Sequence, residues 1–229
     1  MISVRAVAIA SVAVVLGASP VAAQELSRYR VYSLESSVAS VVKISGTRAD
    51  DTKVLHERPA RIQEVEWRAP YVMSDTEGAD PVRDVRFSFY DDQLYQLVVT
   101  YDRDRMEGLT NDDLIESLSA TYGVPLLRQV KSARTAVAAD VPQETIIVAQ
   151  WEDSTSLLTL TRGTYSPDFQ LALISKTLDA RARAAIKEAL RLDTQEAPQR
   201  DLDQRKKEVA DAHVASQKAR VVNKAAFKP

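Results

Sequence analysis

Two stretches of this sequence follow the same plan, and that duplication constrains the fold more than any other feature. Each begins with a predicted helix that ends at a glycine, with apolar residues five and eight positions before it: Val41 and Val38 before Gly46, and Leu118 and Ile115 before Gly123. Each then reaches a strand with one of the chain's two tryptophans, Trp67 or Trp151, followed by two more apolar strands. Since neither unit can bury its apolar face alone, we predict two copies of one helix-then-strands unit in a single sheet. Chance similarity between two amphipathic helices is the alternative.

The clearest local pattern lies inside the first unit. Val85, Phe87 and Phe89 alternate with polar residues, an Asp91-Asp92 turn follows, and residues 95–101 alternate again, which predicts an antiparallel hairpin. Other patterns predict the remaining elements: strands at 29–32, 54–55, 62–67, 145–151, 157–161 and 169–174; helices from Ser36 or Ser37 to Gly46, from Thr110 to Gly123 and from 178 to 192; and irregular segments at 68–81 and 128–144. This order predicts an α+β fold, a two-layer structure in which an antiparallel sheet carries helices on one face.

The first 23 residues have the pattern of a secretory signal peptide. They carry one cation, Arg5, then an apolar run from Ala6 to Leu16 and small residues up to Ala23. The run is shorter than the roughly 20 residues of a spanning helix, so we expect cleavage after Ala23 and no stable membrane anchor afterwards. A buried N-terminal helix is the alternative. The predicted location is periplasmic or secreted, and with no cysteine in the chain, lipid attachment and disulfides are excluded.

Charge divides the remaining chain into a domain at 24–193 and a helical tail at 194–229. The formal net charge of −2 combines a domain at −6, a tail at +3 and the single positive charge of Arg5 in the signal segment. Because nucleic-acid proteins show a basic excess, we expect no nucleic-acid partner. The tail is predicted to break at Pro198 and restart as a helix over 199–222. Either this helix projects into solvent, or it docks on a partner through a set of cationic and apolar residues, Lys218, Arg220, Lys224 and Phe227.

The second unit also resembles a known family. Gly108-Leu109-Thr110-x-x-Asp113-Leu114, then Tyr122-Gly123-x-Pro125-Leu126-Leu127, then Trp151 is similar to the helix, Gly-x-Pro and Trp pattern of the SmpA/OmlA (BamE) envelope domains. Those domains are similar in fold to tandem-repeat inhibitors of β-lactamase. The resemblance implies a small two-layer envelope domain that binds proteins. This chain departs from the pattern in lacking the lipid-bearing cysteine and in having a long tail, which leaves outer-membrane anchoring unsupported.

Residues suited to catalysis or metal binding are sparse. Asp102 and Asp104 begin like a Ca²⁺ loop, but Met106 takes the third ligand position, so a solvated turn beside a helix N-terminus is the better interpretation. His56 lies in a polar segment, and no Gly-x-Ser-x-Gly turn or phosphate loop occurs. We predict no catalytic residue, no metal site and no cofactor.

Four aromatic or apolar residues are candidate binding residues. Tyr95 and Tyr101 are predicted to share a strand face, where they either stack a ligand or pack in the core. Tyr71 and Met73 fall in the 68–81 loop, where they either form a binding patch or close the core at the sheet edge.

Three functional hypotheses remain. The first is a non-enzymatic, exported bacterial envelope protein whose domain binds or scaffolds another protein. The second is a hydrolase or carbohydrate-active protein that uses carboxylates. The third is an inhibitor of a secreted enzyme, which predicts loops from both units gathered along one face of the sheet.

Overall fold

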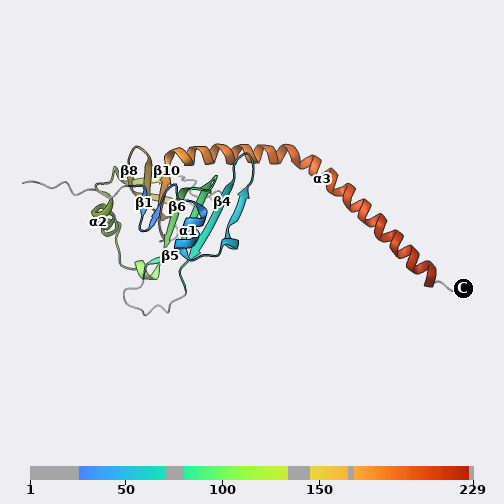
Figure 1. Ribbon diagram of the computed structural model, residues 1–229. Helices are drawn as coiled ribbons and strands as arrows, with labels where there is room; N and C mark the ends of the chain where they lie inside the picture. The colour runs from blue at the N-terminus through green and yellow to red at the C-terminus, as the bar shows by residue number, and fades with distance from the viewer. Residues whose placement is uncertain (1–25, 71–79, 134–144, 165–167, 227–229) are drawn as a thin grey trace, which may run out of the picture.

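The protein is an α+β domain from which a long helix projects (Figure 1). This computed structural model describes residues 26–70, 80–133, 145–164 and 168–226. Eight strands form one antiparallel sheet in the order β3-β4-β5-β6-β10-β9-β8-β7. Their bounds are β3 (Lys53–His56), β4 (Ile62–Arg68), β5 (Val82–Tyr90), β6 (Gln93–Tyr101), β7 (Leu127–Ala133), β8 (Thr145–Glu152), β9 (Ser156–Gly163) and β10 (Phe169–Ser175). The helices are α1 (Val38–Ser45), α2 (Asn111–Tyr122) and α3 (Lys176–Ala226).

The duplicated plan is visible in the topology. One helix-then-four-strand unit comprises α1 and β3 to β6, and the other comprises α2 and β7 to β10. The last strands of the two units, β6 and β10, pair with each other in the centre of the sheet, for example at Val99 and Leu171. The predicted fold class is therefore confirmed, with α1 and α2 on one face of a shared sheet.

Both predicted helix boundaries follow from capping. Ser37 accepts a hydrogen bond from the Ser40 amide at 3.3 Å, and Gly46 ends α1 with a left-handed φ of 69°. At α2, Thr110 and Asp113 form a reciprocal capping box, in which the hydrogen bonds from Thr110 hold the pKa of Asp113 below its usual value.

The main core lies between the sheet and its α1/α2 face. Val41 of α1 and Ile115 of α2 are buried against strand residues such as Phe87 and Trp151. A small hairpin of β1 (Arg28–Tyr29) and β2 (Tyr32–Ser33) also packs here, and its Tyr32 ring lies 4.8 Å from that of Phe87. The single strand predicted at 29–32 is thus two short strands, because Arg30 has a positive φ and turns the chain.

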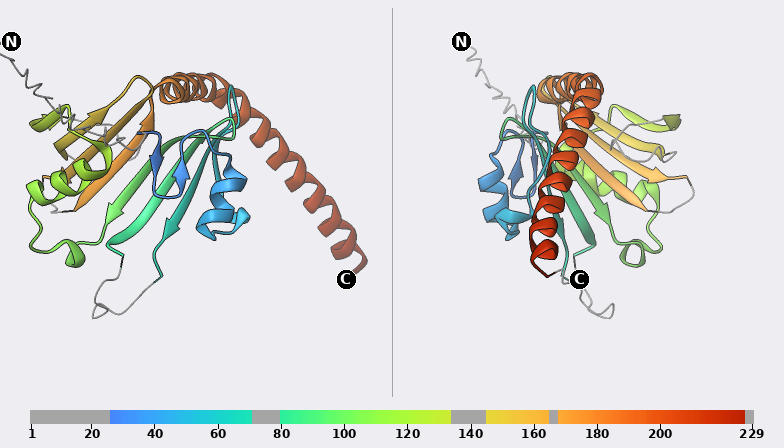
Figure 2. Two further views of the ribbon diagram at one scale, coloured as in Figure 1. Left: turned by 60° about the vertical axis from the view of Figure 1, so that its left-hand side comes forward. Right: turned by 90° about the vertical axis from the view of Figure 1, so that its right-hand side faces the viewer.

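The start of α3 packs on the opposite face, at one end of the sheet (Figure 2). Leu178, Ala182 and Ala185 form a second cluster with Ile62 and Tyr95. After this contact α3 leaves the domain. Among the described helices, none is long and apolar enough to cross a membrane.

Two predictions of local structure were wrong. Residues 128–133, at the start of the segment predicted as irregular, belong to the edge strand β7, which pairs with β8. The helix predicted to end at Leu192 continues as α3 to Ala226 with Pro198 inside it, and Figure 1 shows α3 bending between its two ends. Arg200 supports the helix around the proline by donating to the Asp193 carboxylate at 3.2 Å and to the Asp193 carbonyl at 3.0 Å.

Candidate functional site

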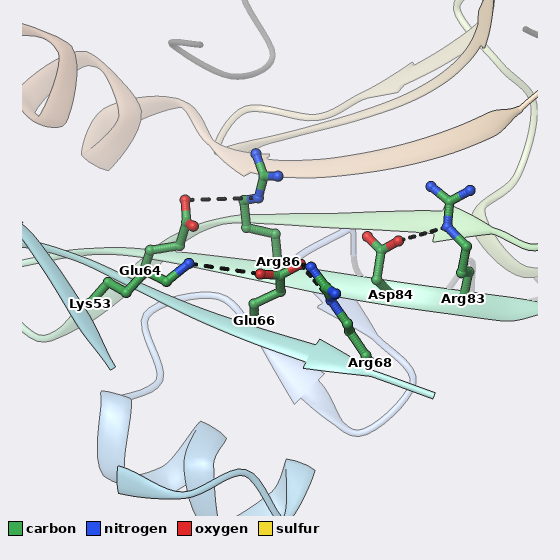
Figure 3. Close-up of polar contacts among 7 residues, drawn as sticks. All are labelled: Lys53, Glu64, Glu66, Arg68, Arg83, Asp84 and Arg86. Atoms are coloured by element: carbon green, nitrogen blue, oxygen red, sulfur yellow. Dashed lines mark hydrogen bonds and ion pairs between the residues drawn. The ribbon is translucent and has the colours of Figure 1, made fainter. Parts of the chain in front are cut away.

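The second face of the sheet, opposite α1 and α2, carries a group of charged side chains beside the α3 contact (Figure 3). We call this group the charged strip. It comes from β3, β4 and β5 and consists of Lys53, Glu64, Glu66, Arg68, Arg83, Asp84 and Arg86.

Strand alternation places these residues on one face, apart from Arg83, which lies at a register shift between Val82 and Asp84. In β4, Val65 and Trp67 belong to the main core, so Glu64, Glu66 and Arg68 point the other way. In β5, Val85 and Phe87 likewise belong to the core, which leaves Asp84 and Arg86 on the second face. The register then sets Glu66 opposite Arg86 across the two strands.

Ion pairs join the residues of the strip in three separate groups. Arg68 donates to one Glu66 oxygen from Nε at 3.0 Å and from Nη2 at 2.9 Å, and this bond raises the pKa of Arg68. Lys53 Nζ lies 3.9 Å from the other Glu66 oxygen. Further along the strip, Arg86 Nε lies 3.8 Å from Glu64 and Arg83 donates to Asp84 at 2.9 Å.

The two signs of charge differ in exposure. The acidic side chains are 20–26% exposed, whereas the basic side chains are 41–76% exposed. The carboxylates therefore form the floor of the strip and the cations form its outer layer. An arginine has five N–H donors, so Arg68 keeps donors beyond the two that bind Glu66.

Most of the described side chains on the rest of the second face are neutral and buried, apart from the exposed Glu152 of β8, which pairs with Lys176 at 2.7 Å. β6, β9 and β10 contribute side chains of 3–9% exposure, including Gln96, Thr100, Thr159, Thr161 and Ala172. The accessible chemistry of this face is therefore concentrated in the first unit.

The two candidate tyrosines do not share a face, which corrects the sequence prediction. Tyr95 is the extra residue of a β-bulge, since Ser88 pairs with Gln96 and Phe89 with Leu94. The bulge puts Tyr95 under α3 at 7% exposure, while Tyr101 packs against the main core. In these positions both rings pack in cores, and they do not form a stacking platform.

Tyr101 instead belongs to a tyrosine cluster with Tyr29 and Tyr122 beside an ion pair. Burial raises the pKa of all three phenols, that of Tyr122 to about 12. Tyr122 donates to the Arg28 carbonyl at 3.1 Å. Arg30 binds Asp80 through two hydrogen bonds, of 2.5 and 2.9 Å, and this pairing lowers the pKa of Asp80. The cluster joins the N-terminal hairpin to the start of β5 and to α2.

The remaining predicted binding residues are scattered. Lys218, Arg220 and Lys224 are exposed on the projecting part of α3. Tyr71, Met73 and Phe227 lie outside the described residues. The predicted loops at 68–81 and 128–144 also fall partly outside the described residues. The strands that flank these loops reach the same end of the sheet, where Arg68, Val82, Ala133 and Thr145 all lie.

Other candidates have structural roles. His56 ends β3 and lines a cleft with Arg58 and Asp193. The volume of this cleft, about 190 Å³, is below the roughly 300 Å³ at which small-molecule sites begin. Asp102 accepts hydrogen bonds from the amides of Asp104 and Arg105, so this segment, which begins like a Ca²⁺ loop in sequence, is a hydrogen-bonded turn. Within the described residues, no three acidic or histidine side chains are placed to hold a metal ion.

Sequence reasoning missed the charged strip, although its signal was present. Charged residues occupy every second position at Glu64, Glu66 and Arg68 and again at Asp84 and Arg86. What the sequence could not supply is the register that brings Glu66 beside Arg86.

Comparison with known proteins identifies no relative of this chain: no family model, no curated protein and no solved structure matches it.

Proposed function

We propose that this chain is an exported, non-enzymatic envelope protein that binds another protein through the charged strip. The observation that carries the proposal is the layered charge of the strip, an acidic floor that fixes an outer layer of cations. Because arginine is enriched in protein interfaces and its fork matches carboxylates, a partner that presents acidic side chains would complement this surface.

The same proposal includes export from the cytoplasm and a family relationship. The N-terminal signal pattern supports export, and the two helix-then-four-strand units support a relationship to SmpA/OmlA-like and β-lactamase-inhibitor-like domains. A protein-binding role agrees with that relationship.

The ion pairing favours binding over the carboxylate-hydrolase hypothesis. Glu64, Glu66 and Asp84 each lie within 4 Å of a cation. Each of these acids is therefore already engaged by a cation of the strip itself.

One observation supports a second candidate, an inhibitor of a secreted enzyme. The loop after β4 and the loop after β7 leave the same end of the sheet. They are carried by different units, and a shared docking site at this end would involve both.

The test is quantitative crosslinking capture from envelope extract of the producing cell. We expect the double variant Arg68→Glu/Arg86→Glu to recover at least about tenfold less partner than the native chain, because interface arginines are frequent hot spots. The matched control is Lys43→Glu/Arg103→Glu, which makes the same charge change at exposed positions outside the strip.

Equal recovery by the strip variant and the native chain would refute the role of the strip. Failure of the native chain to enrich any protein over a mock capture would refute the binding function as a whole. Unchanged urea midpoints would establish that the variants are folded.

A further inference from the structure

The projecting part of α3 is an unpartnered helix. Every residue from 198 to 224 is exposed, and residues 199–226 extend about 42 Å at about 1.5 Å per residue. Its apolar residues are too dispersed to form a coiled-coil seam, since Leu202 and Val209 are followed seven residues later by Ser216. Charge is therefore the main chemistry that this helix offers a partner.

The end of the helix carries cations only. After Asp211 the sequence has no acidic residue. Arg220 and Lys224 stand four positions apart, so they share one face of the helix as a like-charge pair. Among the described residues neither has an ion-pair partner.

A matching pair of opposite sign lies on α2. Asp112 and Glu116 are also four positions apart, are exposed, and have no ion-pair partner within the described chain. Like charges at this spacing repel, so each helix would be stabilised by the other's charges. Figure 1 shows α2 and the end of α3 at opposite ends of the molecule, so one copy cannot bring its own pairs together.

We propose that the end of α3 docks beside α2 of a second copy of this chain, with Arg220 and Lys224 facing Asp112 and Glu116. Because the two surfaces differ, a single contact between two copies leaves one α2 and one α3 end free. These free surfaces can be used reciprocally, which closes a twofold dimer, or head-to-tail, which builds larger rings or chains. This inference does not depend on the charged strip.

A second copy fits this helix better than a membrane surface does. Interfacial helices present bulky apolar or aromatic residues on one face, whereas the exposed apolar residues near this end of the described helix are three valines, Val214, Val221 and Val222. Four cations follow Asp211 in the sequence, which is the lower limit for lipid-binding segments, so an anionic vesicle is the competing partner in the test below.

Sedimentation equilibrium of the purified chain tests the proposal. We expect concentration-dependent association that weakens at least about tenfold between 50 and 500 mM NaCl. Arg220→Glu/Lys224→Glu should weaken it at least about tenfold, and Arg220→Gln/Lys224→Gln should weaken it less. The matched control, Arg205→Glu/Lys207→Glu, makes the same charge change on the same helix and should stay within about threefold of the native chain.

A charge swap gives the sharpest result. Chains with Asp112→Lys/Glu116→Lys should not associate with one another, but they should associate with chains carrying Arg220→Glu/Lys224→Glu. A monomer at all concentrations, association insensitive to salt, or failure of the swapped mixture would each overturn the proposal. Binding to vesicles containing 30% phosphatidylglycerol that is lost in Arg220→Glu/Lys224→Glu, without self-association, would overturn it in favour of a membrane.

Discussion

The two tryptophans hold matching positions in the two units but differ in burial and hydrogen bonding. Substituting each in turn therefore tests the packing. Trp151 is 1% exposed, and its indole N–H donates to the Gly123 carbonyl at 2.8 Å, tying β8 to the end of α2. Trp67 packs against the same core but is only half-buried. We predict that Trp151→Phe destabilises the domain much more than Trp67→Phe.

The magnitude follows from the lost contacts. Phenylalanine leaves a gap of ~40 Å³, which costs about 1 kcal/mol at ~24 cal/mol per Å³. Removing the donor from a part-buried carbonyl adds about 1–2 kcal/mol. Trp151→Phe should therefore lower the free energy of unfolding by about 2–3 kcal/mol, and Trp67→Phe by about 1 kcal/mol or less, because solvent already reaches that site.

Urea unfolding followed by tryptophan fluorescence makes this measurement. Each variant retains one tryptophan, so the signal reports on the core of the other unit and is free of the helical signal from the projecting part of α3. If the slope of the unfolding free energy against urea concentration is unchanged, the shift in midpoint gives the loss of unfolding free energy directly. Equal losses in the two variants, or a loss below about 1 kcal/mol for Trp151→Phe, would refute this account of the packing.

Three further predictions concern conformation and pH. Gly46→Ala should cost about 1 kcal/mol of backbone strain in urea unfolding, since φ is 69° and an added Cβ meets no atom within 4 Å; no loss would contradict the left-handed cap. The Asp80 pKa lies below 3.8 in the folded chain because of Arg30, so its contribution to stability is complete above that pH and is lost as the pH falls through the lowered value. Asp80→Asn should flatten the fall in urea midpoint between pH 5 and pH 3, and an unchanged slope would count against the Arg30 pairing. The Tyr122 pKa is raised from 10.0 to about 12, so its contribution holds below pH 10 and is lost as the pH rises toward 12. Absorbance titration at 295 nm should show tyrosines that ionise late in the native chain, with one fewer in Tyr122→Phe.

The sequence predicted those parts of the fold that rest on local chemistry. The alternation of Phe87 and Phe89 and the caps at Ser37 and Thr110 each act within a few residues, and each prediction was confirmed. The errors came where a partner distant in sequence decides the outcome. β7 has no strong alternation of its own and exists through its pairing with β8, and the Tyr95 bulge depends on the register with β5.

The site was harder to predict for the same reason. A charged residue at every second position of a strand is also the ordinary pattern of a solvated sheet face. Only the register shows that Arg86 faces Glu66, and only the side-chain exposures show that the cations lie outside the acids. Tyr95 and Tyr101 drew attention because of their residue type, yet their surroundings assign them to cores.

The internal duplication allows the two units to be compared position by position. Trp67 and Trp151 correspond, so Glu66 matches Gln150, and their cross-strand partners, Arg86 and Thr159, match as well. The core positions of both units remain apolar, whereas this pair on the second face is charged in the first unit and neutral in the second. The matched positions also differ in exposure, since Thr159 is 7% exposed whereas the Arg86 side chain is 41% exposed. Of the two copies, only the first unit therefore presents a charged and accessible pair at this position of the second face.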